Sequence, residues 1–517
     1  MARGLKPQTI SSDSALGSAV IERSLRFDAN SNTRLTRTIG STSNRRTYTY
    51  SWWLKRSYES AEQYVWYVGA SSGTPYLDAR FEANSHELQI QDYTPSRPIR
   101  FITNRKFRDV SSWYHFVFAV DTTQGTASNR AKLYVNGVQE TSFSTETYPD
   151  QNYDSSANVS GHIQVWGTNQ ASTSNDLEGY LAEAHFVDGQ QLTPSSFGFT
   201  DPVTNIWMPK RYEGTHGTNG FHLDFSDNSS ASALGIDKSI NGNDFTVNNF
   251  GTHDALKDSP LNNQFCTWNT ISTINLPELR EGNLKQMGTN NTACNGTIGV
   301  TSGKWYWEQY CLTDISSSSY ITTAGVTKYA QENDGDVEPR LAYTTGRSFY
   351  RGGSTSGYLN YKNYNQTSST EQNSGGTFWG GAVISFRLDM DAGTLKYYTN
   401  NTLVHTDSSI PTDGTTLFPM NSNTNSGTSR YNSIVSNFGQ DSSFAGNKTA
   451  QGYTDENGMG DFYYPVPSGF RALCVRNLHK PTTSILNPDQ HFKTVIYTGD
   501  NTEYRKISLK FKPDFLW

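Results

Sequence analysis

The chain has 517 residues, enough for roughly three average domains or for two large β domains with tails. Aromatic residues make up 13% and charged residues only 17%, which excludes a disordered chain because such chains lack aromatics and carry high net charge. Its net charge of −6 gives no basic footprint, so no nucleic-acid partner is expected. No run of about 18 apolar residues is present, so no membrane insertion is expected either.

The four cysteines are widely spaced and form no Cys-x-x-Cys pair. They predict neither a disulfide scaffold nor a zinc site, and we expect buried free thiols. Residues 1–22 are polar, without a signal-peptide apolar core, and are predicted to form an N-terminal arm.

Short alternating runs rich in Tyr, Trp, Val and Ile recur along the chain and predict β-strands. Asn136-Gly137, in the sequence KLYVNGVQET, lies between two such runs and is a strong hairpin signal. Residues 391–393 (Asp-Ala-Gly) play the same part between two later runs. We therefore expect an all-β protein of two antiparallel β-sandwich (jelly-roll) domains in tandem, with extended N- and C-terminal tails. The runs cover residues 48–54, 63–68, 113–120, 132–135, 383–388 and 394–398.

The first sandwich is predicted for residues 23–208. Its series of segments includes the strand Trp113-Tyr114-His115, a hairpin ending Tyr134-Val135-Asn136-Gly137, and residues 179–183 (GYLAE) followed by an Asp-Gly turn at 188–189. This order resembles a laminin-G-like domain of the concanavalin A type.

Residues 209–218 contain Gly214 and Gly217 and are predicted to form a linker. The second sandwich is predicted for residues 219–475. Residues 303–308 (GKWYWE) and 324–326 (AGV) precede the hairpin at 383–400, an order that resembles a SPRY domain.

Residues 476–517 are predicted to be an extended tail with a hairpin formed by 491–499 and 506–517. We expect this hairpin to dock between chains, because a lone hairpin is marginal in water.

Segments such as GYLAEAHFVDGQQLTPSSFG and WMPKRYEGTHGTNGFHLDFSDNSS resemble structural proteins of marine tailed bacteriophages. The resemblance implies a non-enzymatic structural protein located in the virion, as a tail fibre or a tail-associated appendage. A head fibre or capsid decoration protein is the alternative within the virion. The implied partners are the protein itself in a homo-oligomer such as a trimer, other virion proteins and a host-surface glycan. The resembling proteins continue beyond the equivalent of Trp517, so a truncated, processed or shortened chain is expected.

Two further interpretations belong to other classes: a secreted glycan hydrolase and a free-standing lectin. A hydrolase needs two carboxyl groups in one groove, about 5 Å apart in retaining enzymes. Glu178 and Glu183 are five residues apart, so strand alternation predicts opposite faces. His115 and His222 lie in aromatic strands and are predicted to be packed histidines, and no Gly-x-Ser-x-Gly elbow is present. We therefore expect no enzymatic activity.

A calcium ion is the metal that the sequence leaves open as a cofactor. Asp237 and Asn241 follow the first half of an EF-hand loop, but position twelve is Asn248 instead of Glu, and a β-turn is the favoured interpretation. Asp121, near Asn129, is similar to a calcium ligand that some laminin-G-like domains carry.

Glycan binding needs aromatic faces together with hydrogen-bonding side chains in an open groove. Tyrosine-rich segments supply the candidates, although such loops pack against a neighbouring subunit as readily as against a sugar. The candidate residues are Tyr148, Tyr153, Tyr358, Tyr361 and Tyr364.

Overall fold

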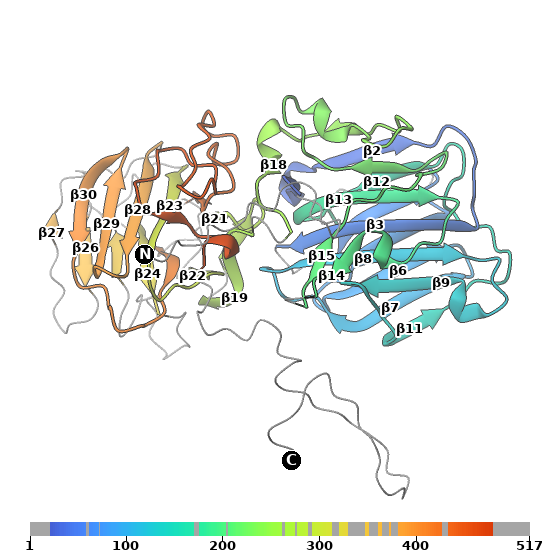
Figure 1. Ribbon diagram of the computed structural model, residues 1–517, viewed down its shortest axis with the longest axis horizontal. Helices are drawn as coiled ribbons and strands as arrows, with labels where there is room; N and C mark the ends of the chain where they lie inside the picture. Colours follow the sequence, from blue (N-terminus) through green and yellow to red (C-terminus); the bar gives the residue numbers. More distant parts are fainter. Residues whose placement is uncertain are drawn as a thin grey trace, which may run out of the picture.

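The computed structural model describes residues 21–478, apart from 58–60, 72, 170–174, 203–204, 261–263, 275–276, 288–291, 313–319, 329–346, 351–359, 364–371, 374–380 and 426–432. Within these residues the chain forms β-strands and short 3-10 turns and no α-helix, which confirms the all-β expectation. None of the described helical segments is long and apolar enough to span a membrane. Figure 1 shows two sandwiches side by side, the first in blue to green and the second in yellow to orange.

The first sandwich is built from two antiparallel sheets, which we call sheet I and sheet II. In order across sheet I the strands are β10 (Val138–Gln139), β9 (Ala131–Val135), β8 (Trp113–Asp121), β3 (Thr47–Arg56), β13 (Gly179–Asp188), β1 (Ser24–Phe27) and β18 (Ala255–Leu256), with β16 (Phe221–Leu223) paired to β13. In order across sheet II they are β11 (Phe143–Thr147), β7 (Ile99–Lys106), β6 (Glu87–Tyr93), β5 (Tyr76–Phe81), β4 (Gln63–Gly69), β12 (Ile163–Trp166), β2 (Arg34–Thr38) and β17 (Thr246–Asn248).

Alternate residues of each strand fill the space between sheets I and II. On β3 the inward side chains include Tyr50 and Trp52, both buried. The Tyr50 ring stacks on Trp66 of the opposite sheet at 4.1 Å between centroids. The core of the first sandwich is therefore dominated by aromatic contacts between the two sheets.

The predicted hairpin at Asn136-Gly137 is confirmed. Strands β9 and β10 pair antiparallel around these two residues, and both have positive φ, 48° for Asn136 and 82° for Gly137. Two left-handed residues in succession suit the right-handed twist of the flanking strands, and Asn and Gly are the residues that adopt this conformation most readily.

The second sandwich contains sheets III and IV. In order, sheet III consists of β19 (Trp268–Ile274), β22 (Thr292–Gly296), β31 (Phe418–Asn425), β24 (Tyr320–Thr327), β25 (Arg347–Tyr350), β26 (Asn360–Asn363) and β27 (Gln372–Asn373). In order, sheet IV consists of β20 (Glu278–Arg280), β21 (Lys285–Met287), β32 (Ser433–Asn437), β23 (Lys304–Cys311), β28 (Val383–Asp389), β29 (Thr394–Thr399) and β30 (Thr402–Asp407), with β33 (Arg471–Ala472) parallel to β23.

The boundary between the sandwiches differs from the expected linker at 209–218 and second-domain start at 219. Strand β16 pairs with β13, β17 with β2 and β18 with β1, so residues 221–256 complete the sheets of the first sandwich. These are long-range pairings that bring the chain back to its first strands. The first strand of the second sandwich is β19, which begins at Trp268.

Besides the four sheets, the described residues form a small two-stranded sheet and short 3-10 turns. Strands β14 (Gly198–Thr200) and β15 (Trp207–Pro209) form a separate two-stranded sheet. The 3-10 turns are η1 (Ala29–Ser31), η2 (Ala127–Asn129), η3 (Pro194–Ser196), η4 (Ser232–Gly235), η5 (Thr252–Asp254) and η6 (Val475–Asn477).

The described ends of the expected tails pack against the body. Ile21 is 1% exposed and joins the same apolar cluster as Trp268, and Leu478 packs against that cluster. Residues 1–20 and 479–517, which include the predicted C-terminal hairpin, lie outside the described residues. The four cysteines are buried free thiols, as expected: Cys266, Cys294, Cys311 and Cys474.

Candidate functional site

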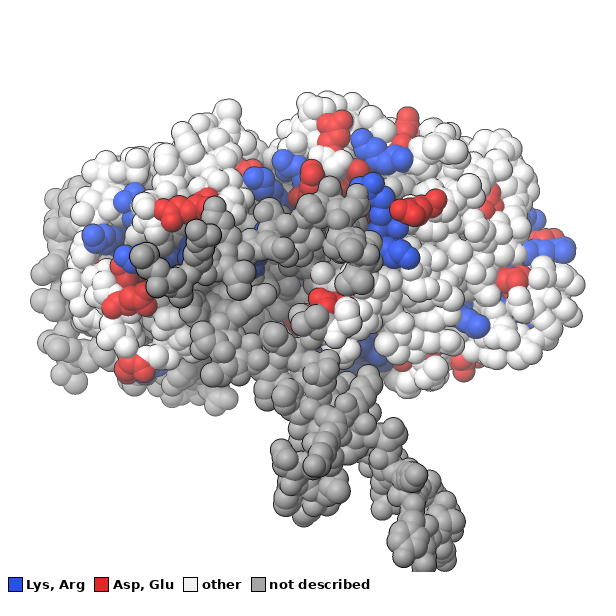
Figure 2. Space-filling model, viewed as in Figure 1, with Lys and Arg blue, Asp and Glu red and all other residues white. Residues whose placement is uncertain are grey.

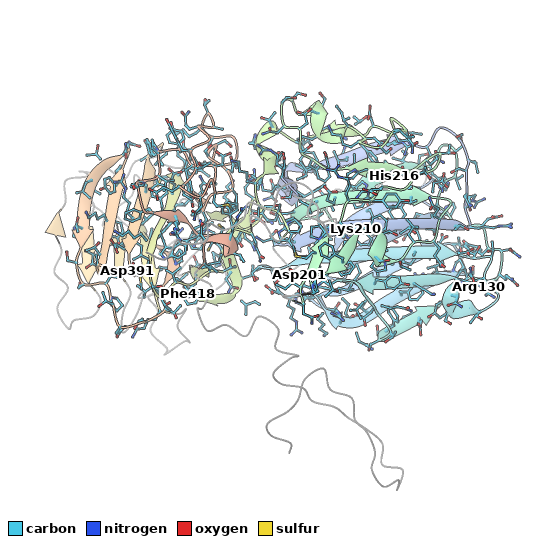
Figure 3. The ribbon with its side chains drawn as sticks, viewed as in Figure 1. Arg130, Asp201, Lys210, His216, Asp391 and Phe418 are labelled. Carbon is cyan, nitrogen blue, oxygen red and sulfur yellow. The ribbon has the colours of Figure 1, made fainter. Side chains whose placement is uncertain are left out.

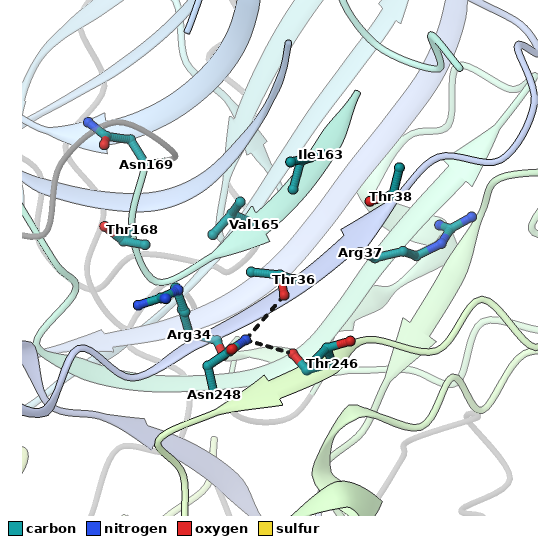
Figure 4. Close-up of a pocket in the computed structure, with 10 residues that line it drawn as sticks. All are labelled: Arg34, Thr36, Arg37, Thr38, Ile163, Val165, Thr168, Asn169, Thr246 and Asn248. Carbon is teal, nitrogen blue, oxygen red and sulfur yellow. Dashed lines mark hydrogen bonds between the residues drawn. The ribbon is translucent and has the colours of Figure 1, made fainter. Parts of the chain in front are cut away.

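The outer face of sheet II carries a groove of about 370 Å³ over β2, β12 and β17 (Figure 4). Leu35 of β2 is in the core, so strand alternation turns its neighbours Arg34 and Thr36 toward the groove. Most lining side chains are Thr, Asn or Arg: Arg34, Thr36, Arg37, Thr38, Ile163, Val165, Thr168, Asn169, Thr246 and Asn248.

Hydrogen bonds hold the floor of this groove in place. The Asn248 amide donates to the Thr36 hydroxyl at 3.1 Å and to the Thr246 carbonyl at 3.1 Å (Figure 4). The guanidinium of Arg37 donates to Asn243 at 2.6 Å and to the Asn219 carbonyl at 3.0 Å, so it fastens the returning segment to β2. The groove therefore depends on the strand pairing that residues 221–256 add.

The strand register aligns the groove side chains with a row that continues over the neighbouring strands of sheet II. Thr36 lies opposite Val165, and Val165 lies opposite Tyr67 of β4. The same row continues over β5, β6 and β7 through Asp78, Gln91 and Arg100. Residues opposite one another share a face of the sheet, so a single polar and aromatic row crosses these strands.

Three tyrosines lie together beside this row. The ring centroids of Tyr67 and Tyr76 are 5.2 Å apart, and Tyr76 stacks on Tyr93 at 4.9 Å. The guanidinium of Arg97 lies 4.9 Å from the centre of the Tyr93 ring. Burial raises the pKa of Tyr67 and Tyr76, so their hydroxyls stay protonated at neutral pH and can both donate and accept hydrogen bonds. We call the row together with Tyr76 and Tyr93 the sheet II face.

One arginine organises the charges on this face. Arg80 contacts Glu62 at 2.7 Å, Asp78 at 2.9 Å and Glu82 at 3.2 Å. Burial raises the pKa of Asp78 to about 7, against the opposing effect of Arg80 and of a hydrogen bond from Gln91. The carboxylates near the groove are thus bound to the protein's own cation, and the face offers fixed hydrogen-bonding groups.

The predicted glycan tyrosines Tyr148 and Tyr153 lie elsewhere. Tyr148 packs edge-to-face on Phe101 of the core at 5.3 Å, and its hydroxyl donates to Glu146. The Tyr153 hydroxyl donates to Asp92 at 3.2 Å. Neither residue lines the groove.

The other tyrosine cluster cannot be placed at a site. The backbone of Tyr361 belongs to β26, where it lies opposite Phe349. Tyr358, Tyr364 and the side chain of Tyr361 lie outside the described residues.

The predicted calcium ligand Asp121 has its carboxylate engaged by protein donors. It accepts from the Thr123 backbone at 3.0 Å and hydroxyl at 2.6 Å, and from Gln124 at 2.6 Å. Although burial acts to raise it, the pKa of Asp121 is lowered by these hydrogen bonds. This is the geometry of a turn closed by an Asp side chain.

The other predicted ligands, Asp237 and Asn241, form a similar turn. Asp237 accepts from the backbone of His222, Ser239 and Asn243, each at 2.8 Å. The amide nitrogen of Asn241 donates to the Gly217 and Gly220 carbonyls at 2.6 and 2.9 Å. These contacts agree with the β-turn that the sequence favoured, since N–H and O–H groups occupy the positions around the carboxylate.

The carboxylates considered for catalysis have separate surroundings. Glu178 is buried and accepts from the backbone N–H of Ala29 at 2.8 Å and of Gly282 at 3.1 Å, so it joins the two sandwiches. Glu183 instead lies 2.8 Å from His222. His222 is therefore an ion-pairing side chain as well as a packed one, which the sequence pattern did not indicate.

His115 is packed, as expected. It is 1% exposed, accepts at Nδ1 from the Trp207 indole at 3.0 Å and lies 2.9 Å from the Ser51 hydroxyl. Burial lowers its pKa to about 3.

Sequence reasoning missed the sheet II face, although a local signal was present. The strands YLDARF, ELQIQDY and IRFITNRK alternate apolar residues with Tyr, Asp, Arg and Gln. That alternation shows that one face of each strand is polar, but only the register shows that these polar positions form a continuous row.

Comparisons with known proteins concern the fold. Residues 28–195 match the laminin-G-like family described as the concanavalin A-like lectin/glucanases superfamily. Comparison with curated proteins gives no match.

Solved structures similar to the chain include laminin α1 domains LG4-5 of mouse, with 10% identity, a TM-score of 0.29 and coverage of 81% of this chain and 90% of that one. The SPRY domain of human HERC1 has 18% identity, a TM-score of 0.24 and coverage of 33% and 96%. A SAP-like pentraxin of Limulus polyphemus has 14% identity, a TM-score of 0.26 and coverage of 34% and 78%. The family match lies within the first sandwich, which accordingly has the laminin-G-like, concanavalin A-type lectin fold.

Proposed function

We propose that the protein binds carbohydrate, and that the sheet II face is the binding surface. The observation that carries this proposal is the row of polar and aromatic side chains across one face of a lectin-type sandwich, in which Tyr76, Tyr93 and Arg100 are partly exposed and Tyr67, Asp78 and Gln91 are buried. A sugar offers many hydroxyls and small apolar patches, and it is recognised by donors and acceptors that are already fixed in place beside aromatic side chains.

Burial and hydrogen bonding prepare these groups before a ligand arrives. Gln91 is 2% exposed, and its amide donates to the Tyr76 hydroxyl at 3.4 Å. Asp78 is held by Arg80 at 2.9 Å. Side chains already ordered lose little rotational freedom on binding, so more of the contact energy is available as affinity.

The mostly uncharged surface fits a neutral ligand. Figure 2 shows charged side chains scattered over one side of a largely uncharged molecule. With 17% charged residues overall, long-range attraction of a charged partner contributes little, and short-range hydrogen bonds decide recognition.

The test compares two variants that each lack one tyrosine hydroxyl, Tyr76→Phe and Tyr148→Phe. The chain is screened on an array of bacterial surface polysaccharides and β-glucans, and the affinity for a positive glycan is measured by calorimetry. Tyr76→Phe should weaken binding about fivefold, as expected for one hydrogen bond of about 1 kcal/mol. Tyr148→Phe, the same change outside the sheet II face, should leave affinity unchanged. The reverse result would assign the site to the Tyr148 loop.

We propose further that binding occurs without catalysis. The three carboxylates on the sheet II face, those of Glu62, Asp78 and Glu82, all contact Arg80, so each is already engaged by a cation of the protein. Incubating the chain with a bound polysaccharide should release no reducing ends. Release that disappears in Asp78→Asn would overturn this part of the proposal.

The virion setting is a proposal that rests on the resemblance of chain segments to phage structural proteins. In that setting the protein is a tail fibre or tail appendage, with a head fibre or capsid decoration protein as the alternative, and a symmetric homo-oligomer is expected. Light scattering of the purified chain should give a trimer mass, and antibody labelling of particles should mark the tail. A monomer absent from particles would favour a secreted lectin.

A further inference from the structure

Three titratable side chains meet on the outer face of sheet I, away from the sheet II face. Glu183 and His185 belong to β13, and His222 of β16 lies directly opposite His185 in the strand pairing. Their ligand atoms all lie within 4.8 Å of one another. Two strands thus bring an acid and two imidazoles to one point.

A β-bulge positions the acid. The register of β13 against β3 shifts between Ala182 and His185, and Glu183 has φ of 47°. A glutamate in the left-handed region costs energy, and such conformations are concentrated at functional sites. The bulge aims the Glu183 carboxylate at both histidines.

The two imidazoles point at the same oxygen. Oε2 of Glu183 lies 2.8 Å from Nε2 of His222 and 3.5 Å from Nε2 of His185. The two rings stack at 4.0 Å between centroids, with 11° between their planes. Both Nε2 atoms and one carboxylate oxygen therefore face a common centre.

A fourth residue lies next to the other ring nitrogen of His185. Nδ1 of His185 lies 3.2 Å from Nε2 of His216, a side chain labelled on the first sandwich in Figure 3. When Nδ1–H of His185 donates to His216, Nε2 of His185 keeps its lone pair. Ligating histidines are commonly oriented by a hydrogen bond of this kind at the other ring nitrogen.

The cluster is shielded on one side and open on the other. The Phe197 ring lies 5.4 Å from that of His185, and Tyr212 lies 5.0 Å from His216. The side chains of Glu183 and His222 are each 20% exposed, whereas that of His185 is 4% exposed. An ion can reach the cluster from the side of Glu183 and His222.

We propose that Glu183, His185 and His222 bind one divalent transition-metal ion of the zinc class. Two imidazole nitrogens and one carboxylate suit Zn²⁺, Co²⁺ or Ni²⁺, whereas Ca²⁺ and Mg²⁺ prefer oxygen ligands. Three protein ligands leave a further position for water or for a ligand atom. The ion ties β16 to β13 and so fastens the segment that returns to the first sandwich.

The experiment uses the full chain treated with EDTA and freed of chelator. Calorimetric titration with ZnCl₂ should show one ion per chain, and the melting temperature should rise with zinc concentration because the ion binds the folded state. CoCl₂ should produce visible absorption bands of nitrogen- and oxygen-ligated cobalt. CaCl₂ should do neither.

Two ligand variants and one control locate the site. His222→Gln and Glu183→Gln should each weaken zinc binding more than tenfold, since loss of even an outer-shell partner of a ligand costs about 10- to 100-fold. His253→Gln, at a partly exposed histidine elsewhere, should bind zinc as the unmodified chain does. Circular dichroism in EDTA checks that each variant is folded.

Unchanged zinc affinity in folded His222→Gln would overturn the proposal. Absence of a one-to-one zinc isotherm and of a melting shift in the unmodified chain would overturn it without any variant. Neither result bears on carbohydrate binding, because the sheet II face lies on the other sheet.

Discussion

Each outer face of the first sandwich has one arginine that gathers three carboxylates, but the two arginines have different surroundings. Arg26 of sheet I contacts Asp254, Glu281 and Asp441 at 2.9, 3.2 and 3.6 Å, and its side chain is fully buried. Arg80 of sheet II is 12% exposed. The first network joins two sandwiches, whereas the second stays within one face, where Asp78 is buried but Glu62 and Glu82 are partly exposed to water.

The side chains around each arginine explain this difference. On sheet I the outward residues Trp53, Trp113 and Tyr180 belong to the apolar cluster of the second sandwich, and the Tyr180 hydroxyl donates to the Gly282 carbonyl at 2.6 Å. On sheet II the outward positions are mostly polar, with Ile163 and Val165 as apolar members of the groove lining. The same alternation thus gives one face that is partly buried by docking and one that we propose as the ligand-binding surface.

The largest effect is expected where this docking is broken. Arg26→Met leaves three carboxylates facing a buried apolar side chain, and loss of one partner of a buried ion pair costs about 3–5 kcal/mol. The free energy of unfolding, from urea titration followed by tryptophan fluorescence, should fall by that amount.

Arg80→Met is the matched comparison. Glu62 and Glu82 are 26% and 32% exposed, so water can solvate them when the arginine is gone. The loss should be clearly smaller than for Arg26→Met. Equal losses would mean that the sheet II network is as buried as the junction, and the contrast between the faces would fail.

A steric change on the open face should have the next largest effect. Gly69 lies opposite Ile163 and Tyr76 at the edge of the tyrosine group, and a Cβ there would lie 2.5 Å from the Tyr76 Cβ and 2.6 Å from the Tyr67 hydroxyl. Gly69→Ala should therefore displace both tyrosines, cost about 1–3 kcal/mol and weaken glycan binding.

Gly40→Ala is its control, since a Cβ at Gly40 meets nothing within 4 Å. Thermal melting of both variants measures the loss of stability, and calorimetry measures the loss of glycan affinity. A Gly69→Ala protein with full affinity for the glycan would place the binding surface away from the tyrosines.

Structural features that depend on neighbouring residues could be predicted from the sequence. The all-β class and the hairpin at Asn136-Gly137 follow from strand alternation and from a turn that needs two left-handed residues. The domain boundary does not, because β17 at Thr246–Asn248 pairs with β2, which lies about two hundred residues earlier. No local pattern states which distant strand completes a sheet.

The candidate sites show the same limit. Clustering of tyrosines in the sequence points to Tyr148 and Tyr153, whereas the tyrosines that gather in space come from three different strands. His222 was interpreted from its own strand alone, and its partner Glu183 lies 39 residues away on a bulge.

The smallest expected effects concern the pH dependence of stability. Groups on the two faces should change the free energy of unfolding in opposite directions as the pH rises. His115, on the outer face of sheet I, has a pKa lowered to about 3 by burial, against about 6.5 when unfolded. The unfolded state then binds more protons between these values, so this group's contribution to stability is complete above pH 6.5 and is lost as the pH falls. One group changes the free energy of unfolding by at most about 1.4 kcal/mol per pH unit. The His115→Leu variant should therefore show a shallower rise in stability from pH 4 to 6.5, whatever its total stability.

Asp78, on the outer face of sheet II, should act in the opposite direction. Its pKa is raised to about 7 by burial, against about 3.9 when unfolded, so the folded state binds more protons over this range. The contribution of Asp78 to the free energy of unfolding is complete below pH 4 and is lost as the pH rises toward 7. In the unmodified chain the contributions of His115 and Asp78 to the free energy of unfolding change with pH in opposite directions. Together these two groups therefore leave the stability nearly level between pH 4 and 6.5. Asp78→Asn removes one of them, so its unfolding free energy should rise more steeply with pH than that of the unmodified chain. Urea titrations at half-unit pH steps measure this difference, and a shallower slope in Asp78→Asn would show that Arg80 keeps the carboxylate ionised in the folded protein.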